Sequence, residues 1–257
     1  MKYIASWSGG KDSTASIILA HEHNEPLDLI IFSEVMFDKG ISGEMPEHIE
    51  FIKNKCIPLF ESWGYRTKIL HADMTYMDMF LRQPTRGKRF GTGMMTGFPM
   101  SGKCHVNRSV KVLPIKRFLK SLEEEYTQYI GIAIDEPARL DRVAKASSQI
   151  SLLQRYGYTE RMALGLCREY GLLSPVYGFA KRGGCWFCPN ARDRELRHLR
   201  DSHRDLWDRL LELENTPNLI GDVWNKLKRT SIHDKEEQFM WEDRQVTVFD
   251  CLEGMAT

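Results

Sequence analysis

Apolar residues in the first 150 positions recur in two alternating patterns, which predict strands separated by helices. Short apolar or alternating runs predict four strands, at residues 3–7, 29–32, 65–70 and 129–134. Apolar positions at helical spacing predict helices over about 13–23 and 46–63, the second ended by Gly64. Strands that alternate with helices indicate an α/β fold, a doubly wound parallel sheet with helices on both faces.

From about residue 151 onward the pattern is mainly helical, and we expect a domain boundary there. Residues 1–150 would form the α/β domain, and residues 151–257 a helical C-terminal region packed on it. Leucines at helical spacing over 192–214, among balanced arginines and carboxylates, predict a salt-bridged surface helix rather than an RNA-binding face. Residues 83–103 predict a long basic loop, either a lid over an anionic substrate or a solvated segment.

Composition narrows the classes of protein that fit. The chain has 257 residues, of which 42% are apolar, and a net charge of +1, so net charge does not support nucleic-acid binding although a local patch stays open. No apolar run reaches the ~18 residues of a membrane span, and no secretory pattern precedes the first strand. Six cysteines at these spacings suit a reduced cytoplasmic protein, and a homodimer stays open.

The turn between the first strand and the first helix carries the strongest chemical signal. Its sequence is Ser8-Gly9-Gly10-Lys11-Asp12-Ser13. Glycines let backbone N–H groups approach an anion, and the helix N-terminus adds partial positive charge. The spacing differs from that of a Walker-type loop. These six residues predict a phosphate-binding loop, and the alternative is a plain turn that caps a helix.

Cysteines in the second half predict a metal site. Cys185 and Cys188 form a C-x-x-C knuckle after two glycines, a spacing that lets two thiolates reach one metal. Cys104 and Cys167 are the candidates for the two remaining ligands, with His105 in reserve, although Cys167 also fits a buried core position. Four thiolates accept either Zn²⁺ or a [4Fe–4S] cluster, so the metal stays open.

The string S-G-G-K-D-S resembles the pyrophosphatase loop (PP-loop) of the adenine nucleotide alpha hydrolase-like superfamily, whose members cleave ATP between the α- and β-phosphates. Over roughly residues 1–190 the chain further resembles the phosphoadenosine-phosphosulfate reductase-like branch. Three segments carry this resemblance: the cysteine, basic residues and proline at 104–114, the G-x-R-x-(D/E)-like segment at 131–139, and the G-C-x-x-C at 184–189.

The resemblance implies which residues would bind a nucleotide. ATP would place its triphosphate on residues 8–13, with Gly131 near the phosphates and the adenine against the end of the strand at Phe32. Mg²⁺ would bridge the phosphates with help from Asp12. Lys11 and Arg139 would neutralise charge that develops during the reaction. Asp135 and Glu136 would bind metal or position substrate, or else only begin a helix.

Departures from the branch's pattern shape the expected function. Ala133 stands where the branch has an arginine, and Cys251 lies in D-C-L-E-G rather than in the reductases' E-C-G-[LI]-H tail. The dispersed cysteines look closer to the sulfur-transfer members. We therefore expect an enzyme that adenylates an unidentified acceptor, releases pyrophosphate and transfers sulfur from a donor protein such as a cysteine desulfurase. The alternatives are a reductase of phosphoadenylyl or adenylyl sulfate (PAPS or APS) and a non-catalytic nucleotide-binding accessory or sensor protein.

Overall fold

The chain divides into two compact units, each built from two separate segments. The computed structural model describes the backbone of residues 1–99 and 104–254, and side chains as far as Gln245. The first unit comprises Met1–Tyr76 and Val106–Cys185, and the second comprises Met77–His105 and Trp186–Thr257. The expected boundary at residue 150 does not separate these units, because the helices that follow it pack on the first helix of the chain.

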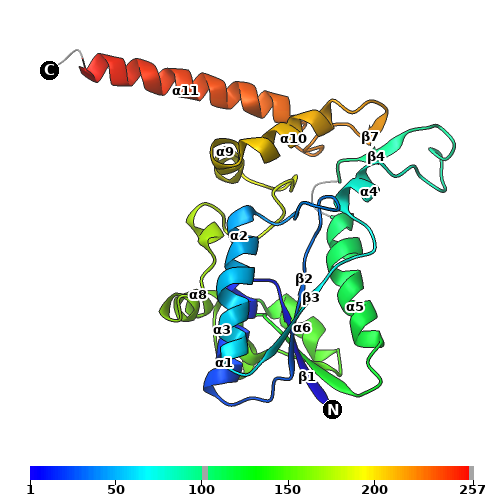
Figure 1. Cartoon of the computed structure of the whole chain (residues 1–257), viewed down its shortest axis with the longest axis vertical. Coiled ribbons are helices and arrows are strands. Elements are labelled where there is room, and N and C mark those ends of the chain that lie inside the picture. Colours follow the sequence, from blue (N-terminus) through cyan, green and yellow to red (C-terminus); the bar gives the residue numbers. More distant parts are fainter. Residues whose placement is uncertain (100–103, 255–257) are drawn as a thin grey trace. The chain divides into compact units, whose positions relative to one another are not determined.

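A five-stranded parallel sheet forms the centre of the first unit (Figure 1). Its strand order is β3-β2-β1-β5-β6. The strands are β1 (Lys2–Trp7), β2 (Leu29–Ser33), β3 (Arg66–Leu70), β5 (Tyr126–Ile130) and β6 (Gln149–Ile150). Ala5 of β1 pairs with Ile30 on one side and with Tyr129 on the other. The predicted α/β fold with a parallel sheet flanked by helices is therefore confirmed.

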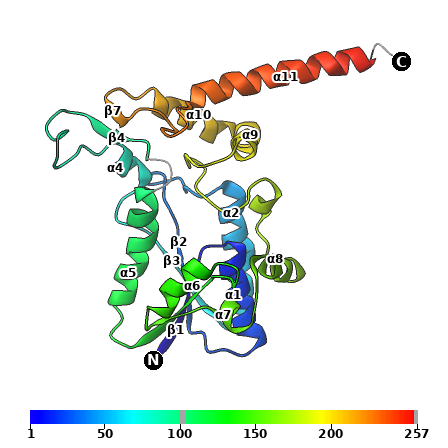
Figure 2. The ribbon, with the colours of Figure 1, turned by 180° about the vertical axis from the view of Figure 1, so that it is seen from behind.

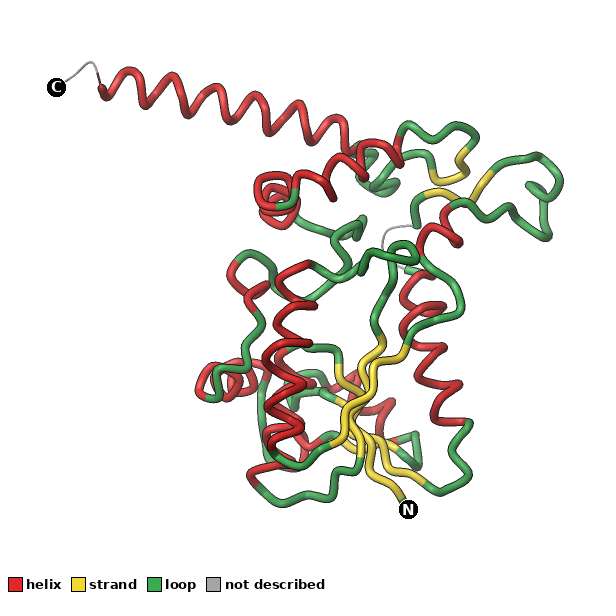
Figure 3. The backbone as a smooth tube through the Cα atoms, in the orientation of Figure 1, coloured by secondary structure: helices red, strands yellow, loops and turns green. Residues whose placement is uncertain are grey.

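Helices cover both faces of this sheet (Figures 2 and 3). One face carries α1 (Lys11–Glu22), α2 (Pro46–Phe51), α3 (Ile57–Ser62), α7 (Leu152–Arg155) and α8 (Glu160–Glu169). The other face carries α5 (Leu113–Lys120), while α6 (Pro137–Ala144) contacts β6. Side chains alternate along β1, so that Ala5 and Trp7 join the core under α1 and Ile4 joins the core under α5.

Two helical stretches of the first unit contain a wide π turn that ends two residues before a proline. The turn η1 (Ile52–Cys56) precedes Pro58, and η2 (Asn107–Val112) precedes Pro114. Proline has no N–H to donate to the preceding turn, and a π turn is a common accommodation of such a break in a helix. The helix predicted over 46–63 is therefore present as α2, η1 and α3 in succession.

The strand predicted at 129–134 lies earlier, at Tyr126–Ile130. The chain leaves the sheet at Gly131, which packs closely on the backbone at the start of α1. The apolar residues 132–134 that prompted the prediction follow this exit. Ala133 is nevertheless buried, so its apolar character serves core packing without strand pairing.

The second unit is mostly helical. It contains most of α4 (Tyr76–Phe80), then α9 (Asp193–Ser202), α10 (Arg204–Glu214), α11 (Ile232–Gly254) and the paired parallel strands β4 (Met95–Gly97) and β7 (Leu219–Gly221). The helix predicted over 192–214 breaks at His203. Arg200 pairs with Glu236 at 2.8 Å, as the salt-bridged interpretation predicts.

Part of the loop predicted over 83–103 is the strand β4, which pairs with β7. Residues 100–103, at the end of that predicted loop, lie outside the described residues. Within the described part of the chain, no helix combines the length and apolar character that crossing a membrane requires.

Candidate functional site: a glycine loop at the end of β1

The glycine loop leaves the carboxyl end of β1 at Trp7 and enters α1 at Lys11. Gly9 adopts a φ of +72°, in the left-handed region that favours glycine. A Cβ at this position would lie 2.6 Å from His48 Cε1 and 2.7 Å from Ile52 Cδ1. Conformation and space therefore both require glycine here, and the loop is held closely against α2 and η1.

Two serine hydroxyls hold the loop together from inside. Ser13 Oγ accepts a hydrogen bond from the Ser8 N–H at 3.2 Å and donates one to the Gly10 carbonyl at 3.0 Å. Ser8 Oγ lies 3.1 Å from Ser13 Oγ and 3.4 Å from the Gly10 nitrogen, which donates to it. These bonds keep a compact turn with backbone N–H groups at the N-terminus of a 12-residue helix, an arrangement that suits an anion.

Gly131 joins the loop from the end of β5. A Cβ at Gly131 would lie 2.4 Å from the Ser13 nitrogen and 2.5 Å from the Asp12 carbonyl carbon. These are backbone atoms, which cannot rotate away as a side chain can. The structure thus brings Gly131 together with the loop, and its absent side chain allows the two backbones to touch.

Lys11 is bound on three sides. Its Nζ donates to both carboxylate oxygens of Asp12 at 2.8 Å and lies 3.4 Å from Glu160 Oε2. Its backbone N–H, at the first position of α1, donates to the Tyr177 hydroxyl at 2.8 Å. The hydroxyl of Tyr177 therefore accepts from an N–H that an anionic ligand would otherwise use.

Charge around the loop is dense and mixed in sign. Burial alone would lower the pKa of Lys11, but the hydrogen bond and charge of Asp12 outweigh it, so this pKa is raised. Burial raises the pKa of Asp12, and the carboxylates of Glu160 and Glu136 raise it further against the opposing effect of Lys11. Carboxylates this close to one another favour binding of a cation near Asp12.

His48 is part of the site although sequence reasoning missed it. Its ring lies between the Ser8 carbonyl, 3.1 Å from Nε2, and Ser174 Oγ, 2.8 Å from Nδ1. Only 1% of the residue is exposed. His48 lies in the first turn of α2 and contacts Ser8, which is 40 positions away in sequence. Local periodicity does not predict a contact between residues so far apart.

Burial lowers the pKa of His48, and Lys111 adds to this effect while Glu44 opposes it. The folded protein therefore keeps the ring neutral where the unfolded chain, with an ordinary pKa near 6.5, takes up a proton. We expect the free energy of unfolding to fall as the pH drops below about 6.5. Urea unfolding at pH 7 and pH 5 should show a smaller loss for His48→Gln than for the parent. Equal losses would contradict this role.

Phe32 does not offer its ring to a ligand. Only 2% of the residue is exposed, and its ring packs on Trp7 with centroids 5.7 Å apart, tilted by 60°. A base at the end of β2 would therefore meet backbone rather than the aromatic face of Phe32. Phe32 lies one residue before the carboxyl end of β2, and its side chain packs in the core.

Arg139 lies on α6, and its guanidinium bonds the carboxylate of Glu136 one turn earlier. Glu136 also accepts a hydrogen bond from the Ala133 N–H at 3.3 Å, and Asp135 accepts one from the Glu160 N–H at 3.0 Å. Both carboxylates thus bond backbone N–H groups. The Arg139 side chain is 48% exposed, which leaves it accessible to an anion.

The predicted thiol ligands have different surroundings. Cys167 is completely buried in the core of the first unit, and its thiol donates to the Lys11 carbonyl at 3.2 Å. Burial, reinforced by the charge of Asp12, raises its pKa to about 12. Its burial and its hydrogen bond to a backbone carbonyl are those of a packed core side chain. The geometry favours the other interpretation of Cys167, a core cysteine like its neighbour Cys56.

The remaining candidate ligands are less buried. Cys185 and Cys188 are half-buried and flank a turn whose two aromatic residues, Trp186 and Phe187, are buried. Cys185 belongs to the first unit, and Cys104 and Cys188 belong to the second. None of the five cysteines with described side chains forms a disulfide, and the side chain of Cys251 lies outside the described residues.

Comparison with known proteins returned no match. No family model, curated protein or solved structure matches this chain. Functional assignment therefore depends on the geometry of the glycine loop and on the resemblance of the motifs.

Proposed function

We propose that this protein is an ATP-binding PP-loop enzyme that adenylates an acceptor substrate, releases pyrophosphate and serves sulfur transfer. The observation that carries the proposal is the loop between β1 and α1. It combines a left-handed Gly9, two hydroxyls at its centre and the N-terminus of a 12-residue helix, where the Ser8, Gly10 and Lys11 N–H groups bond only to hydroxyls that an anion can replace. Such a loop at the carboxyl end of a central parallel strand suits a phosphate chain.

In this proposal the loop binds the triphosphate of ATP, and Lys11 exchanges its carboxylate partners for phosphate oxygens. Mg²⁺, which neutralises phosphate charge, would be held near Asp12, where the charges of Glu136 and Glu160 also act. An acceptor oxygen attacks the α-phosphorus, a new O–P bond forms, and the bond to the β-phosphate oxygen breaks. Pyrophosphate leaves, and Lys11 and Arg139 stabilise the negative charge that develops on it. A sulfur nucleophile then displaces AMP from the acceptor.

The experiment that tests the proposal is titration of the full chain with Mg-ATP, followed by analysis of the nucleotide products. We expect binding of ATP and slow formation of AMP and pyrophosphate, with water replacing the acceptor. Formation of ADP and phosphate would contradict the proposal, because it requires cleavage between the β- and γ-phosphates. Binding without products would favour the accessory or sensor function. Absence of binding would exclude both.

The metal is also a proposal, and its candidate ligands are Cys104, Cys185 and Cys188. As a [4Fe–4S] cluster the group would supply or carry sulfur, and as Zn²⁺ it would stabilise the fold. A cluster with three thiolates keeps one iron open to an external ligand. The same proposal includes three further elements: an acceptor substrate, a separate sulfur-donor protein such as a cysteine desulfurase, and a reducing cytoplasmic location.

Metal content distinguishes the roles of the cysteines. We expect the parent, purified without oxygen, to contain either iron with acid-labile sulfide or zinc. Cys185→Ser should lose the metal, whereas Cys167→Ala should keep it because Cys167 is a core residue. Cys56→Ala is the matched control for loss of a buried thiol. Loss of metal in Cys167→Ala but not in Cys56→Ala would show that Cys167 is a ligand after all.

A further inference from the structure

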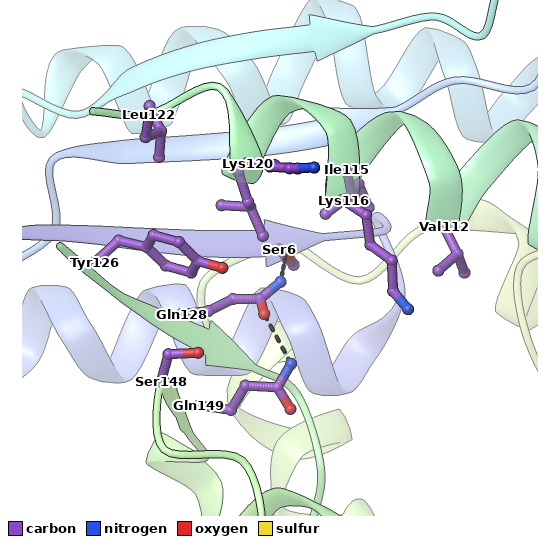
Figure 4. A pocket seen from close by; sticks show the side chains of 11 residues that line it. Ser6, Val112, Ile115, Lys116, Lys120, Leu122, Tyr126, Gln128, Ser148 and Gln149 are labelled. Carbon is purple, nitrogen blue, oxygen red and sulfur yellow. Dashed lines mark hydrogen bonds between the residues drawn. The ribbon is translucent and has the colours of Figure 1, made fainter. Parts of the chain in front are cut away.

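A cavity separate from the glycine loop lies on the α5 side of the sheet in the first unit (Figure 4). It has a volume of about 600 Å³. Its floor is formed by side chains of β1, β5 and β6, and its wall by α5. The residues that decide its chemistry are Ser6, Lys116, Leu119, Tyr126, Gln128 and Gln149.

The floor of the cavity is a chain of polar side chains. Gln128 Nε2 donates to Ser6 Oγ at 2.5 Å, and Gln149 Nε2 donates to Gln128 Oε1 at 2.8 Å. Parallel strands with helices on both faces are normally apolar on both sides. The other half of this face follows that rule, because Ile4 and Ile31 pack under α5. The polar side chains on this half of the face therefore add no apolar packing to the core, and burying them has a cost in free energy.

These side chains keep hydrogen-bonding capacity after their mutual bonds are counted. A glutamine amide has two N–H donors and two acceptor positions on its oxygen. Gln149 uses one of its two donors toward Gln128, and its carbonyl oxygen points away from Gln128 in Figure 4. The floor thus presents an amide edge that complements a planar polar group.

The wall supplies apolar surface and positive charge. Leu119 and Ile115 of α5 line the cavity, and Tyr126 lies at one end with its hydroxyl toward Gln128 (Figure 4). Lys116 extends from α5 at the other end. Within the described residues that line the cavity there is no carboxylate, and the side chains of Lys116 and Lys120 make no hydrogen bond or ion pair with a described residue.

We propose that this cavity binds a small organic anion with a planar aromatic body. The ring would lie between the apolar wall at Leu119 and the amide floor, and the anionic group would meet the ammonium of Lys116. The volume lies within the range of pockets that enclose a small molecule. The carboxylate-free lining selects against cations. The site is independent of the proposed nucleotide chemistry, because it uses the opposite face of the sheet from α1.

The test uses two probes of equal shape and different charge, 2-naphthoate and 2-naphthamide. Saturation-transfer NMR and a fluorescence titration with the full chain should show 2-naphthoate binding up to about fivefold more tightly, as expected for one partly exposed ion pair. Lys116→Met should weaken 2-naphthoate up to about fivefold and leave 2-naphthamide unchanged. Lys116 is exposed, so this variant should fold, and a thermal melt checks that it does.

A control and a competitor complete the design. Lys68→Met removes the same charge from an exposed position on the same face, outside the cavity lining, and should leave binding of 2-naphthoate unchanged. Equal affinity for the two probes, or no effect of Lys116→Met, would overturn the proposal. Displacement of 2-naphthoate by saturating Mg-ATP would also overturn it as a separate site. If the protein fails to bind ATP, in contrast, the proposed function fails and the proposal for this cavity still stands.

Discussion

Replacing Gly131 with alanine should destabilise the protein by about 2–3 kcal/mol and abolish nucleotide binding at the glycine loop. The new Cβ would lie 2.4 Å from the Ser13 nitrogen and 2.6 Å from the Ser13 Cα. Neither atom can move without shifting the start of α1 away from β5. Because the same backbone forms the phosphate-binding turn, one methyl group should impair the fold and the site together. Chemical denaturation and titration with Mg-ATP measure the two effects.

Gly165 provides the matched control. It lies inside α8, and a Cβ there would meet nothing within 4 Å. Gly165→Ala should therefore stabilise the protein by about 0.5–1 kcal/mol, since alanine is the better helix former and restricts the unfolded chain. The same chemical change is thus expected to have opposite signs at the two positions. A Gly131→Ala protein that unfolds like the parent would contradict the close packing of the loop.

Local sequence patterns were sufficient to predict four of the five strands of the sheet and the turn between β1 and α1, but not the short strand β6 (Gln149–Ile150). Strand β1 is an apolar run, α1 follows it at helical spacing, and the two glycines between them leave little choice but a tight turn. The strands are expected to run parallel because a helix separates each strand from the next along the chain. These are short-range properties of the chain, and they place residues 8–13 at the carboxyl edge of the sheet.

Contacts between distant residues were not predictable in the same way. His48 reaches the Ser8 carbonyl, and Tyr177 reaches the Lys11 N–H across 166 residues. Neither residue differs from an ordinary helix or turn residue in its own segment. The second unit poses the same problem, because β4 and β7 pair across more than 120 residues of chain. Three residues in each strand are too few to show a period.

Cysteine chemistry was ambiguous for a physical reason. A thiol suits both a metal and an apolar core, and spacing alone does not separate the two. Cys167 lies on the buried face of α8 with Ala163 and Leu166, which is where helical periodicity places a core residue. The C-x-x-C at 185–188 has no such periodicity. The helical pattern around a cysteine is therefore better evidence of its role, in the core or at a metal, than the presence of the cysteine alone.

Lys11→Met should weaken ATP binding by about 10- to 100-fold. A charged hydrogen bond contributes about 1.5–3 kcal/mol, and each 1.4 kcal/mol changes the dissociation constant tenfold. The variant should keep its fold, because α1 owes its stability to seven buried residues after position 13. Lys39→Met, at an exposed loop position, removes the same charge and should bind ATP as the parent does. Equal binding by Lys11→Met would show that the loop is not a phosphate site.

Glu160→Gln should have the opposite effect and tighten ATP binding severalfold. In the free protein Glu160 lies 3.4 Å from Lys11 Nζ, and its carboxylate is close enough to Asp12 to raise the pKa of that group. An incoming triphosphate must displace this carboxylate and tolerate its charge, so neutralising it removes both penalties. The gain should be largest without Mg²⁺, because Mg²⁺ screens the phosphates and is itself attracted by Glu160. Titrations of parent and variant with and without Mg²⁺ measure the difference. Weaker binding by Glu160→Gln under both conditions would make Glu160 a direct ligand-binding residue instead of a competitor for Lys11.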